Sequence, residues 1–195
     1  MKKSILICSF LLFHVFPLLT QTHISSYVKA EILIDAYSKK DYEIFAFGFP
    51  TSFQEFWDLF GWNSDAKTGN VLYERNVDFL EYFFSDERVL KTENLNKLVS
   101  ISKSYRYEVE APDLLSRLAR ILIRTYPQEI ALYLEVKDDE EIVSFFRLCL
   151  YSGSDYYSSD CYKRKYNALV KALRPYSLKM ESYLRSAYES FKQYL

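Results

Sequence analysis

The chain has 195 residues, of which 49% are hydrophobic and 18% aromatic, and its formal net charge at pH 7 is −1. A chain with this much apolar surface and only four glycines folds around a core and is not a disordered tail. Nucleic-acid-binding proteins normally carry a basic excess, which is absent here, so we expect no nucleic-acid partner.

The first 22 residues have the layout of a secretory signal peptide. Two lysines form a basic start, a mostly apolar run follows, and small residues around Thr22 fit a cleavage site. We therefore divide the chain into a signal peptide, 1–22, and a single α-helical domain, 23–195, which is exported to the periplasm or secreted. The alternative is a retained N-terminal membrane anchor, although Pro17 interrupts the run and a bilayer span needs roughly 20 apolar residues. After cleavage we expect no membrane span.

The segment FAFGFPTSFQEFWDLFGW, residues 45–62, contains eight aromatic side chains. Four of them fall at positions i, i+3, i+4 and i+7 from Phe53 onward, which predicts an amphipathic helix whose aromatic face lies in the core. Ser52 and Glu55 form a capping-box pair before this helix, and Gly61 ends it. We expect the three preceding phenylalanines to fold against the same core as a short alternating stretch, and Trp62 to be the most exposed aromatic of the segment.

Helical periodicity continues to the end of the chain. Pro112 and Pro127 are each placed to begin a helix, and no segment reads as paired strands. The fold class is therefore all-α, an irregular bundle of antiparallel helical hairpins, with a HEAT-like stack as the alternative. The expected helices cover 70–84, the residues after Thr92, 112–126, 128–135, 139–151, the residues after Asp160, and a last stretch that buries Met180, Leu184, Ala187, Tyr188, Phe191 and Leu195.

Two cysteines, Cys149 and Cys161, remain after removal of the signal peptide. In an oxidising compartment an even number of cysteines favours a disulfide, which here would close the loop LYSGSDYYSSD between two helices. Such a bridge would stabilise the domain by about 3 kcal/mol. The alternatives are buried free thiols and a redox pair, although the CxxC spacing of redox enzymes is absent.

Histidine is nearly absent from the exported domain, which holds only His23 at its start. This excludes Ser-His-Asp and Cys-His catalysis and ordinary zinc coordination, and no glycine-rich phosphate motif is present. We expect no cofactor and no metal. A hydrolase that uses two carboxylates about 5 to 10 Å apart is the remaining enzyme hypothesis. Its candidates are Glu55 with Asp58, and the run 138–141, yet the same patterns occur on solvated helix faces and at helix starts.

A stripe of arginines, Arg117, Arg120 and Arg124, lies on one face of the helix expected over 112–126. Arginines in this arrangement would dock an acidic partner or an anionic glycan. The alternative is structural pairing with the acidic run 138–141.

The loop YSGSDYYSSDCYKRKY has the composition of an adaptable recognition loop, because its tyrosines offer contact area at low entropic cost. Tyr156 and Tyr157 are its candidate contacts, and Trp62 is a third candidate. The alternative is a polar connection whose tyrosines lie back on the domain.

Two stretches, FPTSFQEFWDLFGW and EEIVSFFRLCLYSG, are similar to segments of exported, mostly helical proteins of Gram-negative bacteria that have no established activity. The resemblance implies a helical, periplasmic protein and carries over no catalytic or binding residue. Taken together, the residues favour a non-catalytic interaction protein of the bacterial envelope, inhibitor- or immunity-like, with a protein or glycan partner. The alternative is a carboxylate-based hydrolase that acts on envelope glycans.

Overall fold

The structure is a computed structural model that describes residues 25–103, 110–151 and 159–192. Within these ranges the chain forms ten α-helices and very little strand, which confirms the all-α fold class. The expected signal peptide and the candidate contacts Tyr156 and Tyr157 lie outside the described residues. No helix in the described ranges is long and apolar enough to cross a bilayer.

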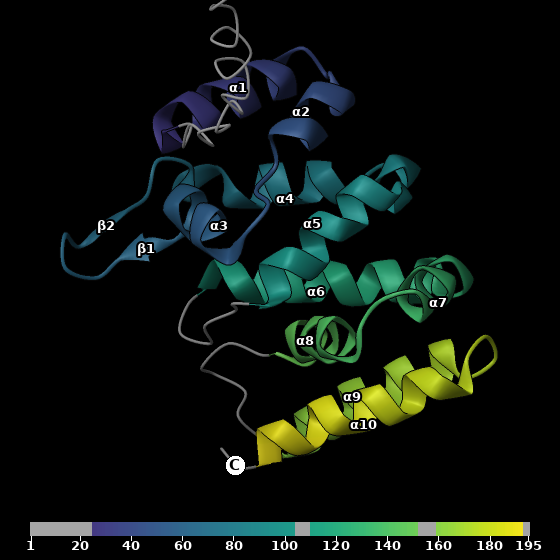
Figure 1. Ribbon diagram of the computed structural model, residues 1–195. Helices are drawn as coiled ribbons and strands as arrows, with labels where there is room; N and C mark the ends of the chain where they lie inside the picture. Colours follow the sequence, from purple (N-terminus) through teal and green to yellow (C-terminus); the bar gives the residue numbers. More distant parts are fainter. Residues whose placement is uncertain (1–24, 104–109, 152–158, 193–195) are drawn as a thin grey trace, which may run out of the picture.

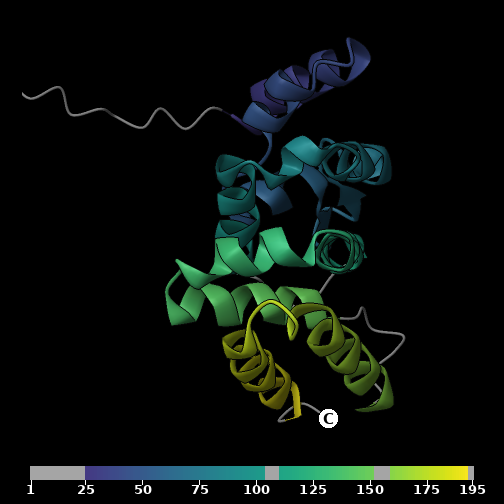
Figure 2. The same ribbon diagram turned by 90° about the vertical axis from the view of Figure 1, so that its right-hand side faces the viewer.

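The helices stack in chain order, from α1 and α2 at one end to α9 and α10 at the other (Figures 1 and 2). Between these ends lie α3 to α5, then α6 and α7, then α8. The helices range from 7 to 16 residues, so the stack is irregular. The elements are α1 (Ser26–Ser38), α2 (Tyr42–Gly48), α3 (Phe53–Phe60), β1 (Trp62–Asn63), β2 (Thr68–Gly69), η1 (Tyr73–Arg75), α4 (Asn76–Phe84), η2 (Glu87–Leu90), α5 (Thr92–Lys103), α6 (Glu110–Thr125), α7 (Pro127–Glu135), α8 (Asp139–Leu150), α9 (Ser159–Leu173) and α10 (Leu178–Lys192).

Helix starts follow the local chemistry that the sequence predicts. The Ser52 hydroxyl accepts a hydrogen bond from the backbone N–H of Glu55 at 3.2 Å, although the Glu55 carboxylate bonds Thr51 and so leaves the capping box half complete. Asp138 and Glu141 form a complete capping box at the start of α8. Pro127 occupies the first position of α7, where its missing N–H costs nothing.

The expectation for the stretch before α3 was partly wrong. Residues 42 to 48 form a helix, α2, so side chains repeat with the helical period and not in alternation. Phe45 and Phe49 are buried, whereas Phe47 is 82% exposed and is therefore more exposed than Trp62 at 36%. Two short strands also form: β1 pairs antiparallel with β2 through Trp62 opposite Gly69.

Three of the four aromatics predicted for the buried stripe lie in the core, and the fourth, Trp57, is partly buried and packs against it. Phe53, Phe56 and Phe60 of α3 are buried, and Phe49 stacks on Phe83 of α4 with ring centroids 3.8 Å apart. Burying a side chain of this size stabilises the fold by roughly 1.5 to 3 kcal/mol. The aromatic segment is therefore mainly the packing surface between the first helices and α4.

Candidate functional site

The carboxyl end of α8 is surrounded by polar side chains from α6 and α9. Arg120 of α6 donates from Nη1 to the carbonyl oxygens of Cys149 at 2.8 Å and Tyr151 at 3.0 Å, and also to the Ser116 hydroxyl at 2.6 Å. Lys165 of α9 donates to the same Tyr151 carbonyl at 2.8 Å. Two cations and a hydroxyl therefore converge on the last carbonyls of one helix, where the helix dipole places negative charge.

Burial disfavours the charged forms of both cations. It lowers the pKa of Lys165 to about 8, with the neighbouring Arg120 charge adding to the effect, and it lowers the pKa of Arg120. Backbone carbonyls accept hydrogen bonds from both side chains, and the negative charge of Asp113 also favours their charged forms. The arrangement fits a structural cap that fixes α8 against α6 and α9.

The three arginines of the stripe therefore lie in different environments. Arg120 points into the molecule, whereas Arg117 and Arg124 are exposed. The alternative interpretation of the stripe, pairing with residues 138–141, does not hold for the described contacts, because Glu141 pairs with Lys103 at 2.8 Å and the Asp139 carboxylate accepts a hydrogen bond from Tyr183. Of the three arginines, only the outer two remain candidate contacts.

The expected disulfide between Cys149 and Cys161 is absent, since both cysteines are free. Cys149 is fully buried on the inner face of α8, where burial raises its thiol pKa to about 12. Cys161 lies in the first turn of α9 and is partly buried. Cys149 therefore packs in the inward stripe of α8 as a small core residue.

A second half-buried cation caps α2. The ammonium group of Lys97 on α5 donates to the carbonyl oxygens of Ala46, Phe47 and Phe49 at 2.6, 2.7 and 3.1 Å. Burial lowers the pKa of this amine to about 8. Sequence reasoning missed Lys97, because its acceptors lie about 50 positions away along the chain.

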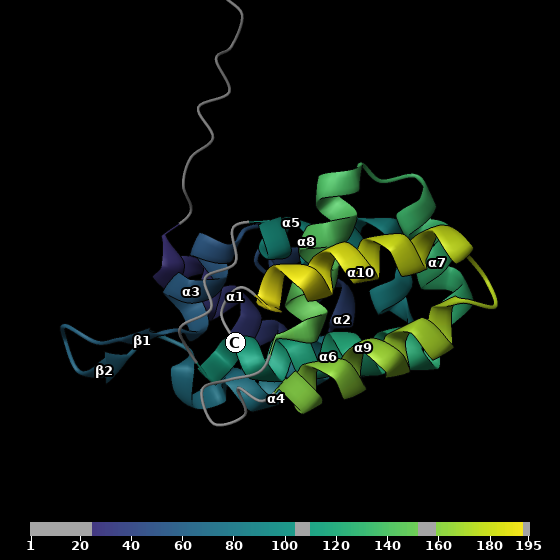
Figure 3. The ribbon, with the colours of Figure 1, turned by 90° about the horizontal axis from the view of Figure 1, so that it is seen from below.

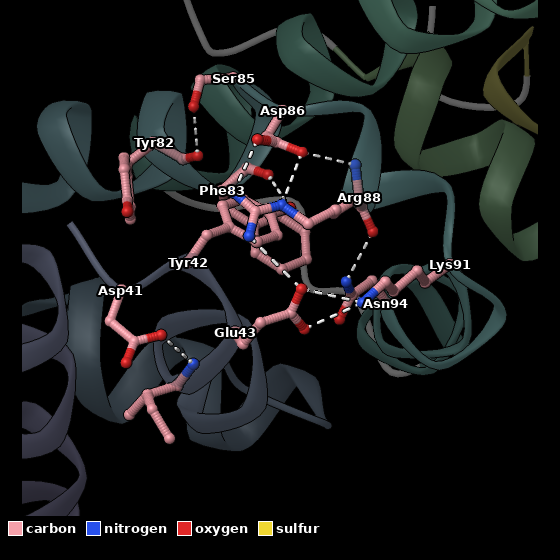
Figure 4. A network of polar contacts seen from close by, with 11 residues as sticks. Asp41, Tyr42, Glu43, Tyr82, Phe83, Ser85, Asp86, Arg88, Lys91 and Asn94 are labelled. Atoms are coloured by element: carbon pink, nitrogen blue, oxygen red, sulfur yellow. Dashed lines mark hydrogen bonds and ion pairs between the residues drawn. The ribbon is translucent and has the colours of Figure 1, made fainter.

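A charged network joins α2 to η2 and α5 (Figure 4). Arg88 forms a bidentate pair with Asp86, at 2.9 Å from Nε and 2.8 Å from Nη2, and its guanidinium lies 4.5 Å above the ring of Tyr42. Glu43 accepts hydrogen bonds from Lys91 at 2.9 and 3.0 Å. Hydrogen bonds from Arg88 lower the pKa of Asp86 to about 2. A cation keeps each carboxylate of this network ionised. We therefore interpret the network as structural, since it connects α2 to η2 and α5.

The carboxylates proposed for hydrolysis are also held by neighbours. Glu55 forms an ion pair with Lys29 at 2.7 Å and accepts hydrogen bonds from the N–H and hydroxyl of Thr51. Burial opposes ionisation of Glu55, but these partners outweigh it and lower its pKa. Asp58 accepts a hydrogen bond from Gln54. A general acid needs a raised pKa, so the environment of Glu55 argues against that role.

The β1–β2 hairpin projects from the body beside α3 (Figures 1 and 3). Trp62 packs on Tyr73 with ring centroids 5.2 Å apart and keeps 36% of its surface exposed. The Asn63 side chain accepts hydrogen bonds from the backbone N–H groups of Asp65 and Ala66 and so shapes the turn. A Cβ at Gly69 would clash with the Cβ and ring of Tyr73, so only glycine fits beneath this ring.

Comparison of the chain with protein-family models, with curated proteins and with solved structures gave no match. The described residues also contain no cluster of three or more histidine, cysteine or carboxylate side chains that could hold a metal ion.

Proposed function

We propose that the chain is an exported, non-catalytic interaction protein of the bacterial envelope, and that the β1–β2 hairpin forms part of its binding surface. The observation that carries the proposal is an ordered projection with no role in the core. None of the residues from 62 to 71 is buried, so this segment adds little to the stability of the fold.

Several specific interactions nevertheless hold the hairpin in one conformation. Its base is fastened by backbone hydrogen bonds from Asn70 to Gly61 at 2.9 Å and from Leu72 to Leu59 at 2.8 Å. The Asn70 side chain also donates to the Trp57 carbonyl at 2.7 Å. A pre-organised loop with a half-exposed tryptophan at its base has the chemistry of an interface anchor, because little entropy is lost when it binds.

The experiment is cross-linking of the intact envelope in the native host, followed by mass spectrometry of what a C-terminally tagged chain captures. Trp62→Ala is compared with Phe47→Ala, which removes a smaller but more exposed aromatic from another surface. We expect a partner that is recovered with the unaltered chain and with Phe47→Ala and is lost with Trp62→Ala. Equal capture by all three chains would overturn the role of the hairpin. Recovery of abundant envelope proteins alone would count against a protein partner.

A further inference from the structure

Charge is distributed unevenly along the chain. Residues 159–192, which form α9 and α10, contain eight lysines and arginines and three carboxylates, a net charge of +5. Residues 25–151 contain 15 basic and 22 acidic residues, a net charge of −7. An almost neutral protein is therefore acidic over most of its length and basic in its last two helices.

Apart from Lys165, which points inward to the Tyr151 carbonyl, the basic side chains of α9 and of Arg174 just after it occupy the side that faces away from the body. Leu169 and Leu173 are buried on the inner side, whereas the outer side is exposed. At 100° per residue the four outer cations fall within an arc of about 100°. They are Lys163, Arg164, Lys171 and Arg174.

Most of these cations have no ion-pair partner among the described residues. Arg174 pairs with Glu181 at 2.7 Å, but Lys163, Arg164 and Lys171 form no ion pair with a described residue. Surface lysines and arginines more often lie among carboxylates, and a run of unpaired ones leaves a positive potential in the solvent.

The exposed side of α10 adds further cations and an apolar group. Lys179 and Arg185 are exposed there, with Arg185 3.6 Å from Glu181. Leu178 begins the helix and is 74% exposed, and Tyr176 in the turn between the two helices is 47% exposed. The turn therefore presents two large apolar side chains between Arg174 and Lys179. The carboxylates of this layer are Asp160, Glu181 and Glu189, fewer than its cations.

The position of α9 and α10 leaves this face uncovered by the described chain. The two helices form the last layer of the stack, and they are nearest the viewer when the molecule is seen from below (Figure 3). Their inner sides pack on the layers before them, so their outer sides point together away from the body (Figure 2). We name this surface, formed by Lys163, Arg164, Lys171, Arg174, Leu178, Lys179 and Arg185, the basic face.

We propose that the basic face binds the surface of an anionic phospholipid membrane. Exposed cations on a broad face attract anionic headgroups, each contributing about 1 kcal/mol near the surface, or roughly a fivefold change in partitioning. The exposed apolar turn favours a lipid over an acidic protein, because Tyr176 and Leu178 can enter the interface while the flanking cations stay among the headgroups. This surface is separate from the β1–β2 hairpin, and its test does not depend on the role of that hairpin.

The test is co-sedimentation of the exported domain, 23–195, with vesicles of phosphatidylcholine alone or with 30% phosphatidylglycerol. The variant Lys163→Gln/Arg164→Gln/Lys171→Gln removes three cations from the basic face. The matched control, Lys39→Gln/Lys40→Gln/Lys67→Gln, removes three exposed cations near the other end of the stack. Circular dichroism and thermal unfolding verify that both variants fold. Leu178→Ser removes the apolar contact alone.

We expect binding to the anionic vesicles that weakens as salt rises. The basic-face variant should bind about 100-fold less tightly and Leu178→Ser about tenfold less tightly, while the control should bind like the unaltered domain. Equal binding to both kinds of vesicle, no binding to either, or equal loss in the control would overturn the proposal. Polyglutamate is added as a soluble competitor. If it binds as tightly as the anionic vesicles, and Leu178→Ser has no effect, the face recognises an acidic polymer and the lipid proposal is wrong.

Discussion

The ammonium group of Lys97 in α5 lies 2.6 Å from the carbonyl oxygen of Ala46 in α2, and it completes the end of a helix that is distant in the sequence. Arg120 does the same for Cys149 at the end of α8. Both helices pass directly into extended backbone, with ψ of 144° at Phe49 and 147° at Tyr151. Neither helix therefore has the left-handed turn that usually bonds the last carbonyls, and a cation from another helix takes its place.

Replacing Lys97 by methionine should lower the free energy of unfolding by about 2 kcal/mol. The substitution keeps the apolar part of the side chain but leaves three carbonyl oxygens without their donor. Lys91→Met is the control, because it removes an exposed ion pair with Glu43 and should cost less than about 1 kcal/mol. Urea unfolding of both variants measures the difference. Equal losses of unfolding free energy in the two variants would show that the hydrogen bonds of Lys97 stabilise the fold no more than an exposed ion pair does.

The contribution of Lys97 should also depend on pH. Its pKa is about 8 in the folded chain and near the ordinary lysine value of 10.5 when the chain is unfolded. The unfolded state therefore binds more protons between these values, and stability from this group rises as pH increases from about 8 to 10.5. The stability difference between the unaltered domain and Lys97→Met should grow over this range. Raised pKa values of Tyr42 and Cys149 act in the opposite direction at high pH, but they are common to both chains and cancel in the difference. A difference that shrinks as pH rises would contradict the assignment.

The three arginines of α6 should behave differently from one another. Arg120→Met should cost about 2 to 4 kcal/mol, because it removes a half-buried cation that bonds the Cys149 and Tyr151 carbonyls. Arg117→Met and Arg124→Met should change stability by less than about 0.5 kcal/mol, since both side chains are exposed. Thermal and urea unfolding of the three variants measure this. If Arg117→Met loses as much unfolding free energy as Arg120→Met, Arg120 has no special structural role and the assignment is wrong.

The hydroxyl of Tyr42 makes a buried hydrogen bond to the Phe83 carbonyl at 2.7 Å, beneath the charged network of Figure 4. Tyr42→Phe keeps the ring and its contact with Arg88 but leaves this carbonyl unsatisfied, so stability should fall by about 1 to 2 kcal/mol. Tyr82→Phe is a neighbouring control, because the Tyr82 hydroxyl makes no hydrogen bond to a described residue. Its stability should change by a few tenths of a kcal/mol at most. If the two variants are equally stable in urea, the hydrogen bond contributes nothing measurable.

Features of the fold that depend on residues close together in the sequence could be predicted, whereas features that depend on distant residues could not. The aromatic stripe of α3 and the capping box of Asp138 and Glu141 depend on residues three or four apart, and the sequence indicates both. Phe47 was misjudged because three phenylalanines at alternate positions resemble a strand, whereas α2 turns the middle one outward.

The candidate site was less predictable, because tertiary packing selects among residues that look alike. Arg117, Arg120 and Arg124 have the same chemistry and one helical face, yet only Arg120 meets the end of α8. No local pattern indicates that Lys97 reaches carbonyls about 50 residues away. The basic face could have been recognised from the sequence, because the excess of lysine and arginine after residue 159 is visible in the composition.

The two cysteines should differ strongly in reactivity. Residues 23–195, treated with a chromogenic disulfide reagent without prior reduction, should release one equivalent quickly from the partly buried Cys161. Cys149 should react only on unfolding, because it is fully buried and its thiol pKa is about 12. Cys161→Ser should remove the fast phase, and Cys149→Ser should leave it unchanged. A native domain that releases no thiol even in denaturant would mean that a disulfide forms after all, and that the free cysteines of the structure are those of the reduced chain.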